Sequence, residues 1–256
     1  MIIGISGKIG SGKDTVGNII QFLTKPNKNP TLEDFLRLHK SSGCGFYEEE
    51  LQSSWKIKKF AGKLKEIVAL LTGCTVEDLE SQEFKNKELG REWWSHKHYT
   101  PDHKIVPRYA TDEQVEYLGT ERIKKPTYRD LLQRVGTEAM RDNILDNVWI
   151  NALFADYKTY YDFDEKGNKA YPNWILTDMR FPNEMKAVED RGGITIRVNR
   201  SIHQADQDLI DTKILDEHPS ETALDNANFK YTITNNSTIE ELIIKVEQIL
   251  ILEKLL

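Results

Sequence analysis

A glycine-rich stretch near the start of the chain has the residues of a phosphate-binding loop. Residues 7–13 read GKIGSGK and match the pattern G-x-x-x-x-G-K. Glycines let successive backbone N–H groups converge on one point, where they form a nest for phosphate oxygens. The N-terminus of a helix behind such a loop adds unpaired donors and a partial positive charge. The pattern therefore predicts nucleotide binding, with Lys13 reaching the β- and γ-phosphates.

The two residues after the loop lysine depart from the general motif. Asp14 stands where Ser or Thr is usual, and Thr15 follows it. A hydroxyl is needed near Mg²⁺, and Thr15 can supply it from this later position. Two interpretations of Asp14 stay open. Either it faces Mg²⁺ through water or pairs with an arginine, or it occupies the first helical turn, where the helix dipole favours an acid.

A second acidic residue, Asp178, follows the apolar run 174–177. The carboxyl ends of strands in a parallel sheet are the usual place for ligands, and an acid there typically organises Mg²⁺ and its waters. Arg180 lies two residues further on and can reach a phosphate, although a surface ion pair with Glu184 is the simpler alternative. Because Asp178 and Arg180 both follow a strand end, we expect them to take part in catalysis.

The hydrophobic pattern supplies the elements that must position these residues. The apolar run 2–6 is typical of a buried strand, and helical spacing of apolar residues follows the loop at 16–23. Other strands are expected at 174–177, 194–198 and 231–233. Other helices are expected around 64–71, 127–139, 185–188 and 239–250, with Thr127 and the capping box 237–240 opening two of them. This alternation predicts an α/β fold with a mainly parallel sheet.

Composition excludes several classes of protein. The chain has 256 residues, of which 39% are hydrophobic and 30% charged, as in soluble globular proteins. No apolar run reaches the ~20 residues of a membrane helix, and no signal peptide is evident, so we expect a cytoplasmic protein without membrane contact. The net charge of −6 argues against a protein that coats nucleic acid. Cys44 and Cys74 form no disulfide framework, and the cluster His96, His98 and His103 is interpreted as a loop and not as a zinc site.

Four segments in this order resemble the deoxynucleoside monophosphate kinases of tailed phages. They are residues 6–15, 129–141, 176–184 and 231–236, which read SGKIGSGKDT, RDLLQRVGTEAMR, LTDMRFPNE and YTITNN. The resemblance implies a P-loop NTP hydrolase-like three-layer fold, formed by a single domain over 1–256. It also implies a helical or irregular substrate-binding insertion at about 25–150. The polar stretch after the strand 194–198 is interpreted as a lid, at about 199–220.

The resemblance also implies a reaction, in which the γ-phosphoryl of ATP passes to a deoxynucleoside 5′-monophosphate with the help of Mg²⁺. The residues implied to bind ATP are Ile9, Gly10, Ser11, Gly12, Lys13, Asp14, Thr15, Arg200 and Asn235. The residues implied to bind the monophosphate are Lys65, Gln133, Gly136, Thr137, Arg141, Trp149 and Glu184. Catalysis is assigned to Lys13, Asp14, Asp178 and Arg180, and metal binding to Thr15 and Asp178.

These assignments make chemical sense. Lys65 and Arg141 can neutralise the acceptor phosphate, the amide of Gln133 can read a base edge, and Asn235 is placed to touch the adenine. Trp149 can stack on a base, although core packing is the commoner fate of a tryptophan. The second pKa of a monophosphate is about 6, so its attacking oxygen is already charged at neutral pH and needs no general base.

Other functions and assemblies remain open from the sequence. A dephospho-coenzyme A kinase, or another P-loop kinase with a small acceptor, shares the early loop, although it usually has Ser or Thr after the loop lysine. A regulatory nucleotide-binding ATPase belongs to a different class, and the acidic balance gives it no support. The last helix is long enough for either a core position or a homodimer interface. The resemblance implies a phage source, and the host cytoplasm as location.

Overall fold

The computed structural model describes residues 1–25, 33–36, 53–90, 93, 126–159, 171–200 and 222–256. They form two compact units, Met1–Gly62 with Trp149–Leu256 as unit 1 and Lys63–Val148 as unit 2. Unit 2 falls within the range expected for the insertion, whereas the expectation of a single domain stays a prediction. The three histidines, Cys44 and nearly all of the expected lid lie outside the described residues.

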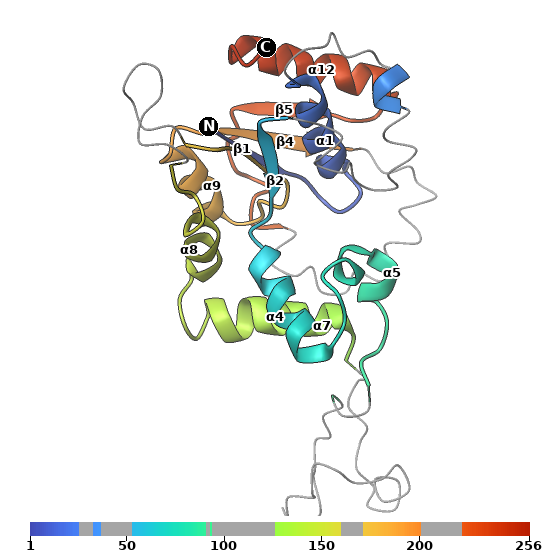
Figure 1. Ribbon diagram of the computed structural model, residues 1–256, viewed down its shortest axis with the longest axis vertical. Helices are drawn as coiled ribbons and strands as arrows, with labels where there is room; N and C mark the ends of the chain where they lie inside the picture. The colour runs from blue at the N-terminus through green and yellow to red at the C-terminus, as the bar shows by residue number, and fades with distance from the viewer. Residues whose placement is uncertain (26–32, 37–52, 91–92, 94–125, 160–170, 201–221) are drawn as a thin grey trace, which may run out of the picture. The chain divides into compact units, whose positions relative to one another are not determined.

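Unit 1 is built on a five-stranded parallel sheet (Figure 1). Its strands are β1 (Ile2–Ser6), β2 (Trp55–Lys58), β3 (Asn173–Leu176), β4 (Ile194–Asn199) and β5 (Tyr231–Thr234). The strand order is β2-β3-β1-β4-β5, and every neighbouring pair is parallel. The expected α/β fold with a mainly parallel sheet is confirmed. Because the order places β1 in the centre, the loop that follows β1 leaves the middle of the sheet.

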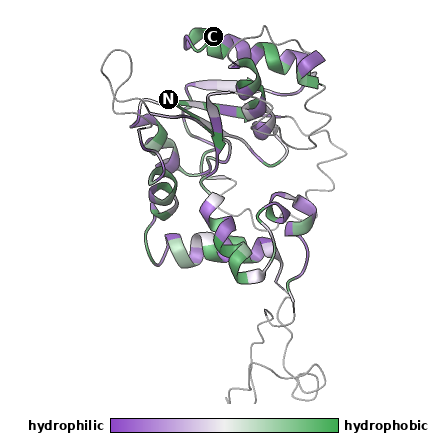
Figure 2. Cartoon of the chain, in the orientation of Figure 1, coloured by the Kyte–Doolittle hydropathy of each residue, from purple (hydrophilic) through white to green (hydrophobic). Residues whose placement is uncertain are grey.

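Helices cover both faces of this sheet, which gives the expected three layers. On one face, α1 (Lys13–Leu23) and α12 (Ile239–Leu252) pack in a cluster with Ile3 and Ile5. On the other face, α8 (Val148–Phe154) and α9 (Pro182–Glu189) contribute to a cluster with Ile2. Successive residues of β1 thus face opposite sides of the sheet. All five are buried and only Ser6 is polar, as expected for a sheet covered on both sides. Figure 2 shows hydrophobic and hydrophilic segments side by side along α12.

The sequence pattern did not predict β2. This strand has only four residues, WKIK, and it lies at the edge of the sheet. Trp55 is buried and Lys56 is exposed, so the strand alternates, but over too short a length to give a clear signal. Lysines are typical of edge strands, where they discourage pairing with another chain.

Two helix starts were predicted from capping residues, and the structure confirms one and shifts the other. Thr127 caps α7 (Tyr128–Gln133) in a capping box with Asp130. The cap of α12 is Thr238, whose hydroxyl accepts a hydrogen bond from the Glu241 backbone N–H. The predicted box over 237–240 is therefore wrong by one residue. The sequence offers two overlapping hydroxyl-x-x-Glu patterns at this point, and the pattern alone does not choose between them.

Unit 2 contains α4 (Gly62–Thr72) apart from its first residue, and then η1 (Asp78–Glu80), α5 (Gln82–Lys85) and α7. A π-helix, η3 (Arg134–Arg141), continues directly from α7. The sequence predicted an ordinary helix around 127–139, and Ala139, at the end of that range, is exposed. Hydrogen bonds that span five residues, such as Asp142 N–H to the Thr137 carbonyl at 3.0 Å, rotate the helix face relative to a four-residue repeat.

A small polar cluster joins the end of α12 to β5 and makes a pH-dependent contribution to stability. The Nζ atom of Lys230 lies 2.7 Å from the Glu253 carboxylate, and the Tyr231 hydroxyl donates to the same oxygen. These two contacts, Lys230 first, hold the pKa of Glu253 below its ordinary value of 4.5. Because the folded-state pKa is the lower one, this stabilisation is present above pH 4.5 and is lost as the pH falls through the folded pKa.

The variant Glu253→Gln is therefore expected to lower the free energy of unfolding by about 1 kcal/mol at pH 7. The difference from the wild type should shrink towards zero as the pH falls from 5 to 3. Thermal unfolding followed by circular dichroism over this pH range measures it. Glu247→Gln, at an exposed position of the same helix, serves as the control and should show no such pH dependence. A deficit that stays constant down to pH 3 would contradict the assignment.

Candidate functional site

The loop between β1 and α1 has the backbone conformation that a phosphate nest requires. Gly10 and Gly12 have φ angles of 78° and 91°, in the left-handed region that other residues rarely adopt. The Ser11 N–H donates to the Lys8 carbonyl at 3.1 Å and closes the turn. Gly12 caps α1, and Lys13 is the first residue of that helix. The loop therefore sits at a helix N-terminus, where unpaired N–H groups favour an anion.

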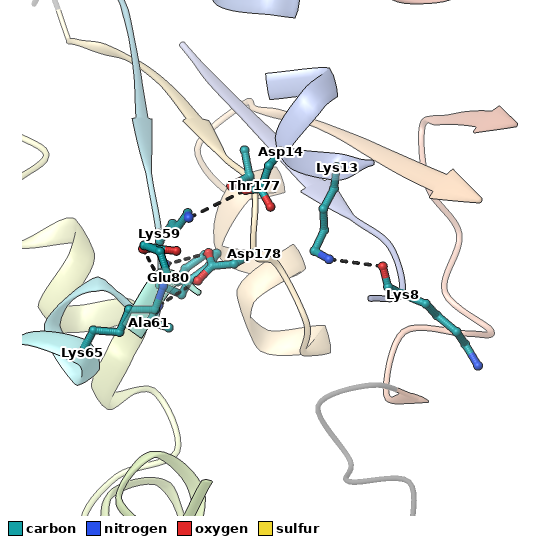
Figure 3. A network of polar contacts seen from close by, with 10 residues as sticks. Lys8, Lys13, Asp14, Lys59, Ala61, Lys65, Glu80, Thr177 and Asp178 are labelled. Atoms are coloured by element: carbon teal, nitrogen blue, oxygen red, sulfur yellow. Dashed lines mark hydrogen bonds and ion pairs between the residues drawn. The ribbon is translucent and has the colours of Figure 1, made fainter. Parts of the chain in front are cut away.

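Three side chains, one of them from the loop itself, approach carbonyl groups of the loop. The Lys13 ammonium donates to the Lys8 carbonyl at 3.2 Å (Figure 3). The Asn235 side chain donates to the Ser11 carbonyl at 2.9 Å, and Arg200 approaches the Gly10 carbonyl at 3.5 Å. The predicted ATP residues Arg200 and Asn235 thus lie at the loop, together with residues 9–15.

The polar partners of Asp14 among the described residues include a threonine and a lysine. Its Oδ1 atom accepts a 2.7 Å hydrogen bond from the Thr177 hydroxyl, and the Lys59 ammonium lies 3.8 Å from the same atom (Figure 3). A lysine that follows β2 thus supplies a cation beside Asp14. Lys59 is a residue that sequence reasoning missed, because the strand that positions it was itself not predicted. Asp14 also lies in the first turn of α1, as the second interpretation held.

Asp178 joins two segments at the carboxyl end of the sheet. Its two carboxylate oxygens accept hydrogen bonds from the backbone N–H groups of Phe60 and Ala61, at 2.8 and 2.9 Å. The residue therefore fixes the start of the segment that leads from β2 towards α4. A carboxylate offers about four lone-pair positions, so these two bonds leave capacity for a metal-bound water.

Glu184 is 1% exposed, and its Oε2 atom accepts from the backbone N–H groups of Arg180 at 2.7 Å and Phe181 at 3.2 Å. This carboxylate caps the first turn of α9 and fixes the backbone from which the Arg180 side chain departs. One contact between these two residues is therefore made through the backbone of Arg180. A substrate contact by Glu184 stays a prediction, and its burial shows a structural task.

Arg197 and Lys8 share one acidic partner, Asp225. The Arg197 Nη2 atom lies 2.6 Å from one oxygen of Asp225, and the Lys8 ammonium lies 3.4 Å from the other. Arg197 also donates to the Ser6 hydroxyl at 3.1 Å. Asp225 links the end of β4 to the phosphate loop. Nothing in the sequence around Asp225 indicated this contact, which depends on the sheet bringing distant segments together.

Unit 2 holds most of the residues implied to bind the acceptor. Gln133 caps η3, and Gly136, Thr137 and Arg141 lie within it. A Cβ atom at Gly136 would come 2.8 Å from a methyl group of Leu64, so the glycine lets η3 approach α4. π-Helical turns occur frequently at functional sites. The π-helix therefore favours a functional role for these residues, independently of the sequence likeness.

Two other residues that the resemblance assigns to the monophosphate are buried in this structure. Lys65 is 8% exposed, and its ammonium lies 2.6 Å from Glu80. A monophosphate bound to Lys65 would therefore share the ammonium group with the Glu80 carboxylate or replace that carboxylate as its partner. Trp149, the first residue of the second segment of unit 1, is 3% exposed. Such burial is typical of a packed tryptophan, and stacking on a base stays a prediction.

The residues at the loop fit a magnesium ion that is held mainly by phosphate and water. Among the described residues, no group of three His, Cys, Asp or Glu side chains could hold a metal ion alone. The available donors, the Thr15 hydroxyl and the carboxylates of Asp14 and Asp178, are all oxygen atoms, as Mg²⁺ prefers. Proteins usually bind Mg²⁺ through one or two such groups and the phosphates of a substrate.

Among the residues that the structure describes, no helix is long and apolar enough to span a bilayer.

Comparison with known proteins agrees with this geometry. A family model described as deoxynucleotide monophosphate kinase matches residues 1–246. A protein of Acanthamoeba polyphaga mimivirus, which carries that name provisionally, is 31% identical over 137 residues, covering 52% of this chain and 65% of its own. The deoxynucleotide monophosphate kinases of Escherichia phage RB69 and Enterobacteria phage T4 are 29% and 28% identical, each over 48% of this chain and 44% of their own. The matched part is therefore less than two thirds of each relative's length. The chain belongs to the deoxynucleotide monophosphate kinase family.

Proposed function

We propose that this protein transfers the γ-phosphoryl group of ATP to a deoxynucleoside 5′-monophosphate. The observation that carries the proposal is the loop at residues 7–13, held at the N-terminus of α1 with Lys13 as the first helical residue. This arrangement binds phosphate by backbone N–H groups and a cation. The family of the chain then indicates the compound that accepts the phosphoryl group.

The donor half of the reaction falls to unit 1. The backbone N–H groups of residues 9–15 would hold the phosphates of ATP, and Lys13 would leave the Lys8 carbonyl to reach the β- and γ-phosphates. Thr15, Asp14 and Asp178 would hold Mg²⁺, which supplies positive charge to the transferred group when bound. Arg180 would add a second cation. Phosphoryl transfer needs alignment and charge neutralisation more than covalent chemistry from the protein.

The acceptor half is assigned to residues of unit 2 and to Trp149. Lys65 and Arg141 would neutralise the phosphate of the monophosphate, and Gln133 would contact its base. With a second pKa of about 6, the acceptor phosphate is mostly a dianion at neutral pH and attacks without a general base. The pH dependence of the reaction should therefore follow the acceptor phosphate, and not a catalytic histidine.

A coupled assay of ADP release with each monophosphate, deoxy and ribo in turn, tests the proposal. We expect ATP consumption to require an added deoxynucleoside monophosphate and to fall close to background without one. Equal consumption with and without an acceptor would instead indicate an ATPase. Turnover with dephospho-coenzyme A but with no monophosphate would indicate the other small-acceptor kinase. Product analysis by anion-exchange chromatography should show a deoxynucleoside diphosphate in equal amount to ADP.

A further inference from the structure

The amide side chain of Asn235 lies against the outer side of the phosphate loop. Asn235 follows β5, and its Nδ2 atom donates to the Ser11 carbonyl at 2.9 Å. Its own backbone N–H donates to the Asn199 carbonyl at 2.7 Å, one residue beyond the pairing of β4 with β5. The residue is thus fixed to the sheet through its backbone and to the loop through its side chain.

The fit between Asn235 and the loop is close. A Cβ atom at Gly12 would lie 2.4 Å from Asn235 Nδ2, a distance that atoms cannot adopt. Gly7 makes a second close approach, because a Cβ atom there would lie 2.6 Å from the Val198 carbonyl. The loop therefore rests on the ends of β4 and β5, and two of its glycines are needed for space. At Gly12 the neighbour that fills this space is Asn235.

The contact fixes the direction of an N–H group that can donate a hydrogen bond to phosphate. The Ser11 carbonyl and the Gly12 N–H belong to one planar peptide unit, so fixing the carbonyl also fixes the N–H. In a nest the N–H groups point inward and the carbonyl groups point outward, where they need donors of their own. Asn235 supplies that donor to Ser11. Without it, the peptide can rotate and the Gly12 N–H can leave the direction of the phosphates.

We propose that Asn235 is a positioning residue for the phosphates of the donor nucleotide, acting through the peptide between Ser11 and Gly12. This assignment differs from the adenine contact that the resemblance implied. It rests on the proposed function only in taking a nucleoside triphosphate as the donor. The two roles of Asn235 differ in the ligands that they affect. The peptide contact would strengthen the binding of any polyphosphate, whereas an adenine contact would strengthen only the binding of ligands that carry the base.

Inorganic tripolyphosphate, which carries no base, separates these roles. Isothermal titration with tripolyphosphate, ATP and GTP, each with Mg²⁺, would be carried out on the full chain and on Asn235→Ala. We expect the variant to raise the Kd of all three ligands by the same factor, about five- to tenfold, as for one lost hydrogen bond. The KM for ATP should rise in proportion, while the KM for the monophosphate stays unchanged. Thr232→Ala, at an exposed position of β5, is the matched control and should bind like the wild type.

Each other outcome would overturn the inference. Weaker binding of ATP with unchanged tripolyphosphate would mean that Asn235 contacts the base. Unchanged binding of all ligands would mean that the loop holds its shape without it. If Asn235→Ala does not fold, Asn235→Leu keeps a similar side-chain size and removes the donor without adding a charge, and the same titrations apply. A wild-type protein that binds neither ATP nor tripolyphosphate would overturn the proposed function as well, which is a different result from a variant that binds normally.

Discussion

Replacement of Lys13 by methionine is expected to reduce kcat/KM by about 10³-fold. Methionine keeps an unbranched side chain of similar length but removes the charge, so packing at the start of α1 should change little. The loss should appear mainly in kcat, because the lysine would meet the charge that develops on the transferred group. Steady-state ADP release over a range of ATP concentrations measures both constants.

The exposed pair at the C-terminal end of α9 gives a matched control for this variant. Lys186 lies 2.8 Å from Asp190, one helical turn away, with both side chains mostly exposed. Lys186→Met removes the same charge from the same unit and should leave kcat/KM within a factor of two of the wild type. Near-normal kcat in Lys13→Met, with an intact far-ultraviolet spectrum, would show that Lys13 has no part in transfer. The proposed donor site would then need a different cation.

Replacement of Asp178 by asparagine should damage both activity and stability. The carboxylate accepts hydrogen bonds from the Phe60 and Ala61 backbone N–H groups, one on each oxygen. Asparagine can accept only one of them, and its NH₂ group would face the other N–H donor. We expect a loss of about 2 kcal/mol in the free energy of unfolding and a fall of at least about 10²-fold in kcat/KM.

Two measurements separate these effects. Urea unfolding reports the stability, and the assay is run at a temperature at which the variant is fully folded. Asp190→Asn, in the same exposed pair at the end of α9, is the control and should change neither quantity much. If Asp178→Asn loses stability but keeps full activity, Asp178 only anchors the segment after β2. If it keeps both, the structural contact itself is wrong.

The parts that the sequence predicted well are those with a local signal. The phosphate loop is a contiguous pattern between an apolar strand and a periodic helix, and the structure places all of it together. Asp178 was found because it follows an apolar run, which marks the end of a strand in any parallel sheet. For Thr127, the capping signal and the contact are three residues apart. In each case the sequence signal lies within a few residues of the structural feature that it predicts.

The parts that the sequence missed depend on contacts between distant segments or on an unmarked change of helix type. Lys59 and Asp225 reach the loop region only because the sheet brings their segments there, 45 and 217 residues away from the partners they contact. The contact of Asn235 with Ser11 was not predicted, because it spans 224 residues. The π-helix over 134–141 has no spacing signature of its own, so an ordinary helix was expected.

The central position of β1 has a consequence for how the chain is made. Its two neighbours are β3 and β4, whose pairing residues begin at Trp174 and Ile194. Ribosomes add about 5–20 residues per second, so the nascent β1 would wait on the order of ten to thirty seconds for its first partner. During that time an apolar strand with two unpaired edges remains open to other chains. Production of this protein should therefore be sensitive to translation speed and to the supply of chaperones, even though the finished sheet buries β1 completely.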